Sequence, residues 1–174
     1  MQNKRVVVTG GGIVSALGND WPTVLKNLKA KKNFVKYMHD WDEKYPLMNT
    51  RLCCPVEFEI DREKYSRKAI RGMGRVAQMA LVATDAALEN AGMLGNEELT
   101  QGRCGIAYGS SIGSVDPLME MYSMLVTNDT SKVGSTTYIK AMPQTCACNL
   151  EVYYHLTGRI ITTNTACTSG SQSI

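Results

Sequence analysis

The 174-residue sequence predicts an α/β fold whose sheet consists mainly of parallel strands. Two observations lead to this prediction. Three runs rich in apolar residues, 5–9, 104–108 and 159–163, each lead into a turn of small residues, which is the pattern of buried strands. The segments between these runs carry helical signals, and strands that alternate with helices form parallel sheets. We detect no linker and no repeat, so we expect one domain over residues 1–174.

Helices in the first half of the chain are predicted from capping residues and spacing. Asn19 or Asp20 caps a helix that has Pro22 in its first turn and extends to about residue 31. The next stretch, 33–54, has poor periodicity, so we expect it to be irregular. A short helix is predicted over 66–73.

Alanines at helical spacing over 76–91 predict the clearest helix, and they imply that its backbone lies close to neighbouring layers. Gly92 occupies the position just after the predicted end of this helix, where glycine is common. Further helices are expected over 116–126 and 145–156, and residues 169–174 resemble the first turns of another. A helix of two turns cannot bury its face. We therefore expect this sequence to be the front part of a longer fold, or a processed fragment.

Composition excludes several classes of protein. The chain is 44% hydrophobic and 20% charged, unlike a disordered tail, a collagen-like chain or a disulfide miniprotein. The net charge is only +3 and the charged residues are scattered along the chain, so we expect no nucleic-acid partner. Because there is no run of about 18 apolar residues, we expect no membrane span. The spacing of the six cysteines does not suit a secreted disulfide framework, so we expect reduced thiols in the cytoplasm.

Cys167 lies at the junction between the third predicted strand and the final helix, among small residues. A sharp turn of this kind projects a nucleophile, while the first N–H groups of the helix point towards it. Those donors favour a thiolate, and they also favour the oxyanion that forms when the thiolate attacks a thioester. The same residues equally fit a buried cysteine that fills a tight turn.

Other motifs give weaker signals. Glycines at 10–12 suggest a dinucleotide turn, but Ser15 stands where a third glycine or alanine is needed, so we expect no cofactor. Cys146 and Cys148 fall on a helix with no second pair at ligand spacing, so we expect no metal. Neither histidine, His39 or His155, has a partner at a meaningful spacing, and we assign no catalytic role to either.

The segment 158–174, which contains the run Thr-Ala-Cys-Thr-Ser-Gly, resembles the active-site segment of the β-ketoacyl synthases. Weaker resemblances to this family occur in the same order over 6–18, 71–75, 108–113 and 140–142, so that the likeness covers essentially the whole chain. The resemblance implies a thiolase-like fold with an αβαβα sandwich of two similar halves. This chain would supply roughly the N-terminal half, as a single incomplete domain that ends just after the nucleophile.

The resemblance also implies the activity and its residues. Cys167 would take an acyl group from an acyl-carrier-protein thioester, and its own N–H would be one oxyanion donor. A malonyl carrier thioester would then lose carbon dioxide and attack the acyl group in a Claisen condensation. Ile112 and Ala166 would line the acyl pocket, and Met142 would reach it across a dimer. The pathway would be fatty-acid or polyketide and polyene synthesis, with a homodimer or a heterodimer with a related synthase.

Two alternatives stay open at this point. A thiolase-type acyltransferase that uses coenzyme A also has a cysteine at such a turn. A non-catalytic scaffold half that binds a partner chain is the second alternative. The family's second half carries two histidines, a lysine and a second oxyanion donor, and the corresponding motifs are absent from this sequence. We therefore expect the 174-residue chain alone to be inactive in condensation.

Overall fold

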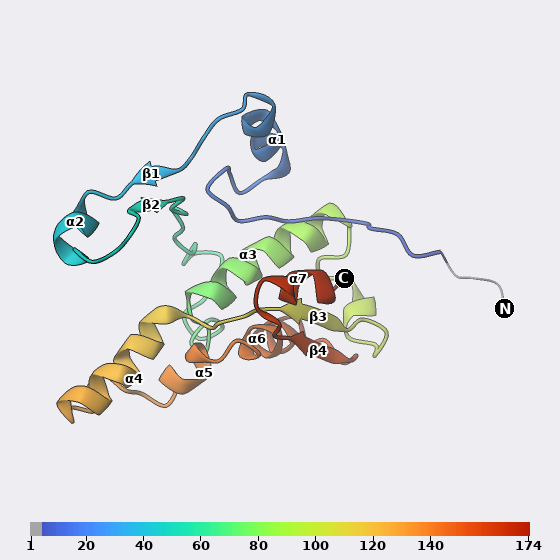
Figure 1. Ribbon diagram of the computed structural model, residues 1–174. Helices are drawn as coiled ribbons and strands as arrows, with labels where there is room; N and C mark the ends of the chain where they lie inside the picture. The colour runs from blue at the N-terminus through green and yellow to red at the C-terminus, as the bar shows by residue number, and fades with distance from the viewer. Residues whose placement is uncertain (1–4) are drawn as a thin grey trace.

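A computed structural model describes residues 5–174 of the chain (Figure 1). Its helices and strands are, in order, α1 (Trp21–Lys29), β1 (Lys36–Tyr37), α2 (Asp40–Lys44), β2 (Leu52–Cys53), α3 (Arg75–Asn90), the 3-10 turn η1 (Glu97–Leu99), β3 (Ile106–Gly109), α4 (Val115–Thr127), α5 (Thr137–Ala141), α6 (Thr145–Tyr154), β4 (Ile160–Thr163), the 3-10 turn η2 (Ala166–Thr168) and α7 (Ser169–Gln172). Within residues 5–174, none of the helices combines the length and apolar character that crossing a membrane requires.

Strands β3 and β4 form a parallel pair, which confirms the second and third predicted strands. Their register runs from Ile106 opposite Ile160 to Gly109 opposite Thr163. The connection between them passes through α4, α5 and α6, as a parallel pair requires. Both α6 and α7 contact the two strands (Figure 1). The carboxyl ends of β3 and β4 therefore lie side by side, and the loops that leave them share one edge of the sheet.

The core lies between α3, α6 and the sheet. Helices α3 and α6 pack against each other, and the most buried large side chains, Leu81 and Leu150, come one from each helix. Ala77 and Ala80 are buried on the same face of α3, and alanines leave room for a neighbouring backbone. Helix α3 confirms the alanine-rich helix predicted from the sequence, and Gly92 follows it with a φ of 66°.

A buried polar cluster ties α3 to its surroundings. Asp85 is only 4% exposed, and its carboxylate accepts hydrogen bonds from the hydroxyls of Tyr65 and Tyr154. It also forms an ion pair with Lys64 Nζ at 2.9 Å. Burial raises the pKa of Asp85, but the hydrogen bonds from Tyr154, Tyr65 and Lys64 outweigh it and hold that pKa below 3.8. The ionised carboxylate thus joins the loop before α3 to both core helices.

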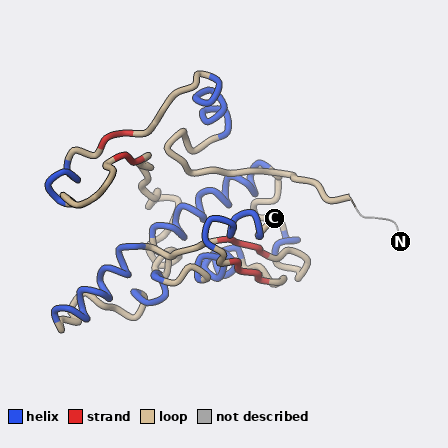
Figure 2. The backbone as a smooth tube through the Cα atoms, in the orientation of Figure 1, coloured by secondary structure: helices blue, strands red, loops and turns tan. Residues whose placement is uncertain are grey.

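The prediction of a strand over residues 5–9 is wrong. The segment is extended but belongs to no ladder, and Val6 and Val8 are 95% and 93% exposed. A β-branched run becomes a strand only when a second strand lies beside it, and none does among residues 5–174. Gly10 and Gly12 instead lie against the backbone of α3, where an added Cβ would overlap main-chain carbonyls. In Figure 2 the segment before α1 is drawn as a loop, without a strand.

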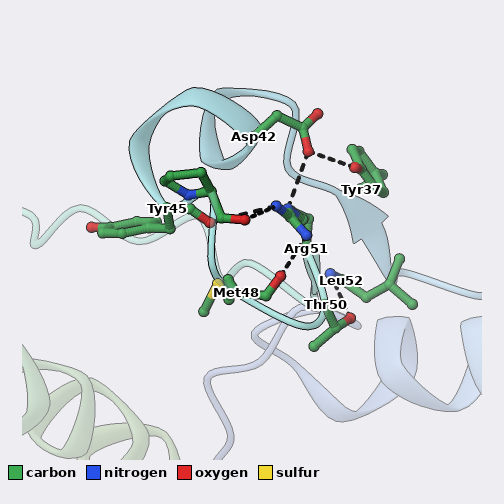
Figure 3. Close-up of polar contacts among 8 residues, drawn as sticks. Tyr37, Asp42, Tyr45, Met48, Thr50, Arg51 and Leu52 are labelled. Carbon is green, nitrogen blue, oxygen red and sulfur yellow. Dashed lines mark hydrogen bonds and ion pairs between the residues drawn. The ribbon is translucent and has the colours of Figure 1, made fainter.

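The stretch 33–54 is more ordered than its sequence suggests. Strands β1 and β2 pair in antiparallel fashion on either side of α2, and Figure 1 shows this arm standing apart from the core. Arg51 holds the turn together: its Nε lies 3.1 Å from Asp42 Oδ1, and its terminal nitrogens donate to the carbonyls of Pro46 and Met48 (Figure 3). Strands of two residues are too short to show a periodicity, which is why the sequence did not indicate them.

The remaining helix predictions divide into confirmed and wrong ones. Helix α1 begins as predicted, with Asp20 Oδ1 accepting the N–H of Thr23 at 2.8 Å. Helices α4 and α6 are confirmed, although α6 ends two residues early because His155 takes a left-handed φ of 53°. The helix expected over 66–73 does not form. Successive turns replace it, and they direct Ile70 into the core.

Candidate active site

Cys167 lies in η2, in the turn that joins β4 to α7, and its side chain is exposed. The sharp strand-to-helix turn predicted from the sequence is therefore present. An exposed side chain does not fit the alternative of a buried cysteine that fills the turn. The residue before it, Ala166, has a φ of 50°. For a residue with a Cβ, this left-handed conformation costs about 1–2 kcal/mol, so the surrounding contacts must hold it.

The hydroxyl of Ser169 supplies those contacts. Ser169 is 3% exposed. Its Oγ accepts the N–H of Thr165 at 2.9 Å and donates to the carbonyl of Ala166 at 2.7 Å. Sequence reasoning did not single out this serine. The only signal was a small polar residue two positions after the cysteine, and its burial is visible only in the fold.

The end of β3 supports the same turn from the other side. Gly109 lies against the backbone of Ser169, and an added Cβ would overlap the serine's carbonyl. Thr163 Oγ1 donates to that carbonyl at 2.7 Å. The N–H of Ser110 donates to Thr163 O at 3.1 Å, which continues the ladder one residue beyond β3. The turn around Cys167 is therefore fixed to both strands.

Two of the residues expected to line an acyl pocket lie in loops at this edge of the sheet. Ile112 follows β3 and is 52% exposed, with its carbonyl accepting from Ser110 Oγ. Ala166 follows β4 and is exposed beside Cys167. Because β3 and β4 are parallel neighbours, their loops leave the same edge, so Ile112 and Cys167 belong to one end of the sheet.

Met142, the third residue expected at the acyl pocket, lies just after α5. It is half-buried, and with Gly113 it lines a small cavity of about 10 Å³, room for about one water molecule. The N–H of Ser114 donates to Lys140 O at 3.0 Å, so the segments around Ile112 and Met142 are in contact. The lining of this cavity includes neither Ile112 nor Cys167.

The other cysteines lie in varied environments, and Cys54 and Cys148 are exposed as Cys167 is. Cys146 is buried in the core, and burial raises the pKa of its thiol to about 11. Cys148, two residues later on α6, is exposed. In the part of the chain that the structure describes, no three histidine, cysteine or acidic side chains gather as they would around a metal ion.

Comparisons with known proteins agree with the geometry. The model of the β-ketoacyl synthase N-terminal domain matches residues 3–174. Among curated proteins, 3-oxoacyl-[acyl-carrier-protein] synthase 2 of Vibrio cholerae is 32% identical over 175 residues, which cover 100% of this chain and 41% of that protein. Nodulation protein E of Rhizobium meliloti is 26% identical, covering 99% of this chain and 42% of its own.

Solved structures give the same result. A β-ketoacyl synthase from Burkholderia phymatum is 43% identical with a TM-score of 0.90, covering 98% of this chain and 41% of that one. The structure of a type II PKS acyl-carrier protein in complex with its ketosynthase has a TM-score of 0.76 at 22% identity over 98% of this chain and 44% of that one, a likeness of fold alone.

The chain thus spans about two fifths of the length of the relatives it matches. The prediction of an α/β, thiolase-like fold is confirmed by these structural neighbours together with the parallel β3–β4 pair. The resemblance seen around Cys167 is confirmed by a family model that covers nearly every residue. The chain belongs to the β-ketoacyl synthase family and corresponds to its N-terminal domain.

Proposed function

We propose that this chain carries the nucleophile of a 3-oxoacyl-[acyl-carrier-protein] synthase, and that Cys167 is the residue that holds the acyl group. One observation carries the proposal. Cys167 is an exposed thiol in a strand-to-helix turn, directly after a residue held in a left-handed conformation. Such turns present a nucleophile at the edge of a sheet. The names of the relatives, 3-oxoacyl-[acyl-carrier-protein] synthases among them, support this assignment.

The proposed reaction has two steps. In the first, the sulfur of Cys167 attacks the carbonyl carbon of an acyl-carrier thioester, and the carrier leaves as a free thiol that takes up the cysteine's proton. In the second, a malonyl carrier thioester loses carbon dioxide, and its carbanion attacks the acyl carbonyl. The bond to Cys167 breaks and releases a 3-oxoacyl carrier, and the sulfur leaves as a thiolate that takes up a proton from solvent to regenerate the thiol. The N–H of Cys167 donates to the oxyanion in each attack.

We assign the acyl chain to the surface beside the turn. The exposed side chains of Ile112 and Ala166 lie at the same end of the sheet as Cys167, which suits an apolar chain leaving the thioester. Met142 would contact the chain from a neighbouring subunit, in a homodimer or in a heterodimer with a related synthase. The carrier protein is the expected partner for both the acyl and the malonyl group.

We propose a compartment on the basis of the thiols. All six cysteines are free, although Cys53 and Cys54 are adjacent and Cys54 is exposed. Exposed thiols persist in a reducing environment, so we place the protein in the cytoplasm.

Intact-mass spectrometry tests the proposal. The chain is incubated with a saturated medium-chain acyl thioester, presented either on acyl-carrier protein or on coenzyme A. We expect one acyl adduct that forms faster from the carrier, that is lost in Cys167→Ala and that remains in Cys148→Ala, the matched change at another exposed cysteine. An adduct formed only from coenzyme A would favour the thiolase-type alternative. No adduct from either donor would contradict the proposal and favour a scaffold half.

A second assay separates acylation from condensation. The chain spans about two fifths of its curated relatives, and the sequence lacks the family's decarboxylation motifs. We therefore expect the 174 residues to form the adduct but to give no 3-oxoacyl product with malonyl carrier. Turnover by the chain alone would contradict this expectation.

A further inference from the structure

We propose that Ser169 is a positioning residue, whose hydroxyl keeps Ala166 left-handed and thereby orients Cys167 for acylation. The inference rests on the proposed function of Cys167 as the acyl-carrying nucleophile. Ser169 itself does not contact the reacting atoms: it acts on the backbone that carries the cysteine.

The burial of Ser169 is the first argument. Ser169 is only 3% exposed, and a buried polar group is retained when its hydrogen bonds are made inside the protein. Both bonds go to the turn before Cys167. The Oγ accepts from the N–H of Thr165 and donates to the carbonyl of Ala166. The one hydroxyl therefore joins the two ends of the dipeptide that sets the direction of the cysteine.

The second argument is that the serine is itself fixed to the sheet. Its carbonyl accepts Thr163 Oγ1 from the end of β4, and it lies against Gly109 at the end of β3. The turn can therefore shift only by breaking contacts with Ser169. Thr165 is held from its other side as well, because its Oγ1 donates to Gln172 Oε1 at 2.8 Å.

The third argument is the conformation that these bonds impose. Alanine at a φ of 50° is strained, whereas glycine adopts this φ readily. Without the serine hydroxyl, Ala166 would relax to a negative φ. That change would rotate the peptide unit of Cys167 relative to the ends of β3 and β4. The thiol would stay exposed but would no longer point in the direction that the site requires.

The test compares two reactions of the same thiol. Acylation from the carrier thioester needs a defined direction of attack, whereas alkylation by iodoacetamide needs only an accessible thiol. In Ser169→Ala we expect acylation of Cys167 to slow about tenfold and alkylation to change less than twofold. Ser173→Ala is the matched control, because Ser173 Oγ also donates to a carbonyl three residues back, that of Gly170, yet does not bond to the turn. We expect it to change neither rate.

A rescue variant separates orientation from loss of structure. Ala166→Gly removes the strain that the hydroxyl opposes, so Ser169→Ala should slow acylation much less in that background than in the original sequence. Amide exchange of Thr165 reports the bond directly, and it should accelerate in Ser169→Ala while the Ser110 amide stays protected.

Two results would overturn the inference alone: acylation unchanged in Ser169→Ala, or acylation and alkylation slowed equally with a matching fall in the urea midpoint. If the unsubstituted chain takes up no acyl group, the proposed function fails and the positioning role fails with it.

Discussion

Replacing Asp85 removes the acceptor at the centre of the buried polar cluster, and it should be among the most destabilising single changes in this chain. In Asp85→Ala, the hydroxyl of Tyr65, which is 2% exposed, loses the only acceptor that the described residues offer it. Leaving a buried donor unpaired costs about 1–3 kcal/mol. Tyr154 loses a charged acceptor but keeps the carbonyl of Leu81 at 3.3 Å, so its loss is about 1 kcal/mol.

The ion pair with Lys64 contributes the smallest part of the expected loss of stability. The side chain of Lys64 is half-exposed, so its ammonium regains water and the pair adds less than about 1 kcal/mol. We expect a total loss near 4 kcal/mol for Asp85→Ala, a large fraction of the stability of an ordinary domain. Asp85→Asn keeps one acceptor oxygen and should lose about 2 kcal/mol. Lys64→Ala, which removes only the exposed partner, is the control.

Urea unfolding followed by circular dichroism at pH 7 measures these differences. The pKa of Asp85 is lowered in the folded state, so its contribution is fully present above pH 3.8 and is lost as pH falls through the folded-state pKa. The gap between the parent and Asp85→Asn should therefore close in strong acid. A loss under 1 kcal/mol in Asp85→Ala, or an equal loss in Lys64→Ala, would refute this account of the cluster.

Three further outcomes follow from the structure. Gly109→Ala should destabilise the chain by about 2–3 kcal/mol and slow acylation, because the new Cβ overlaps the carbonyl of Ser169; an unchanged urea midpoint would contradict that close approach. Asp20→Ala removes the cap on the N–H of Thr23 and should lower stability by about 1 kcal/mol in the same assay. Burial holds the pKa of the Cys146 thiol near 11, so at pH 8 iodoacetamide should label it far more slowly than the exposed cysteines, as peptide mass mapping would show.

The sequence predicted those parts of the fold that are encoded locally. The alanine spacing of α3, the cap at Asp20 and the apolar runs of β3 and β4 are all properties of neighbouring residues, and each led to a correct element. Residues 5–9 carry an equally strong strand pattern. They did not form a strand because pairing depends on a second segment, which no local pattern specifies.

In the candidate site, too, the local features were predictable from the sequence and the contacts between distant segments were not. The turn around Cys167 was predicted because small residues followed an apolar run. What holds that turn could not be predicted, because the hydroxyl of Ser169 and the missing side chain of Gly109 matter only once β3 and β4 lie in register. The placement of Ile112 and Met142 likewise depends on contacts between separate segments.

The unpaired valines near the start of the chain have a consequence for handling the protein. Among residues 5–174, β4 is the only strand that pairs with β3. Residues 6–8 are extended but pair with no strand in this range. Open strand edges recruit any extended peptide that reaches them, including the same segment of another molecule. We therefore expect a concentrated preparation of these 174 residues to aggregate through strand pairing between molecules. Supplying a complementary strand in trans should keep it dispersed.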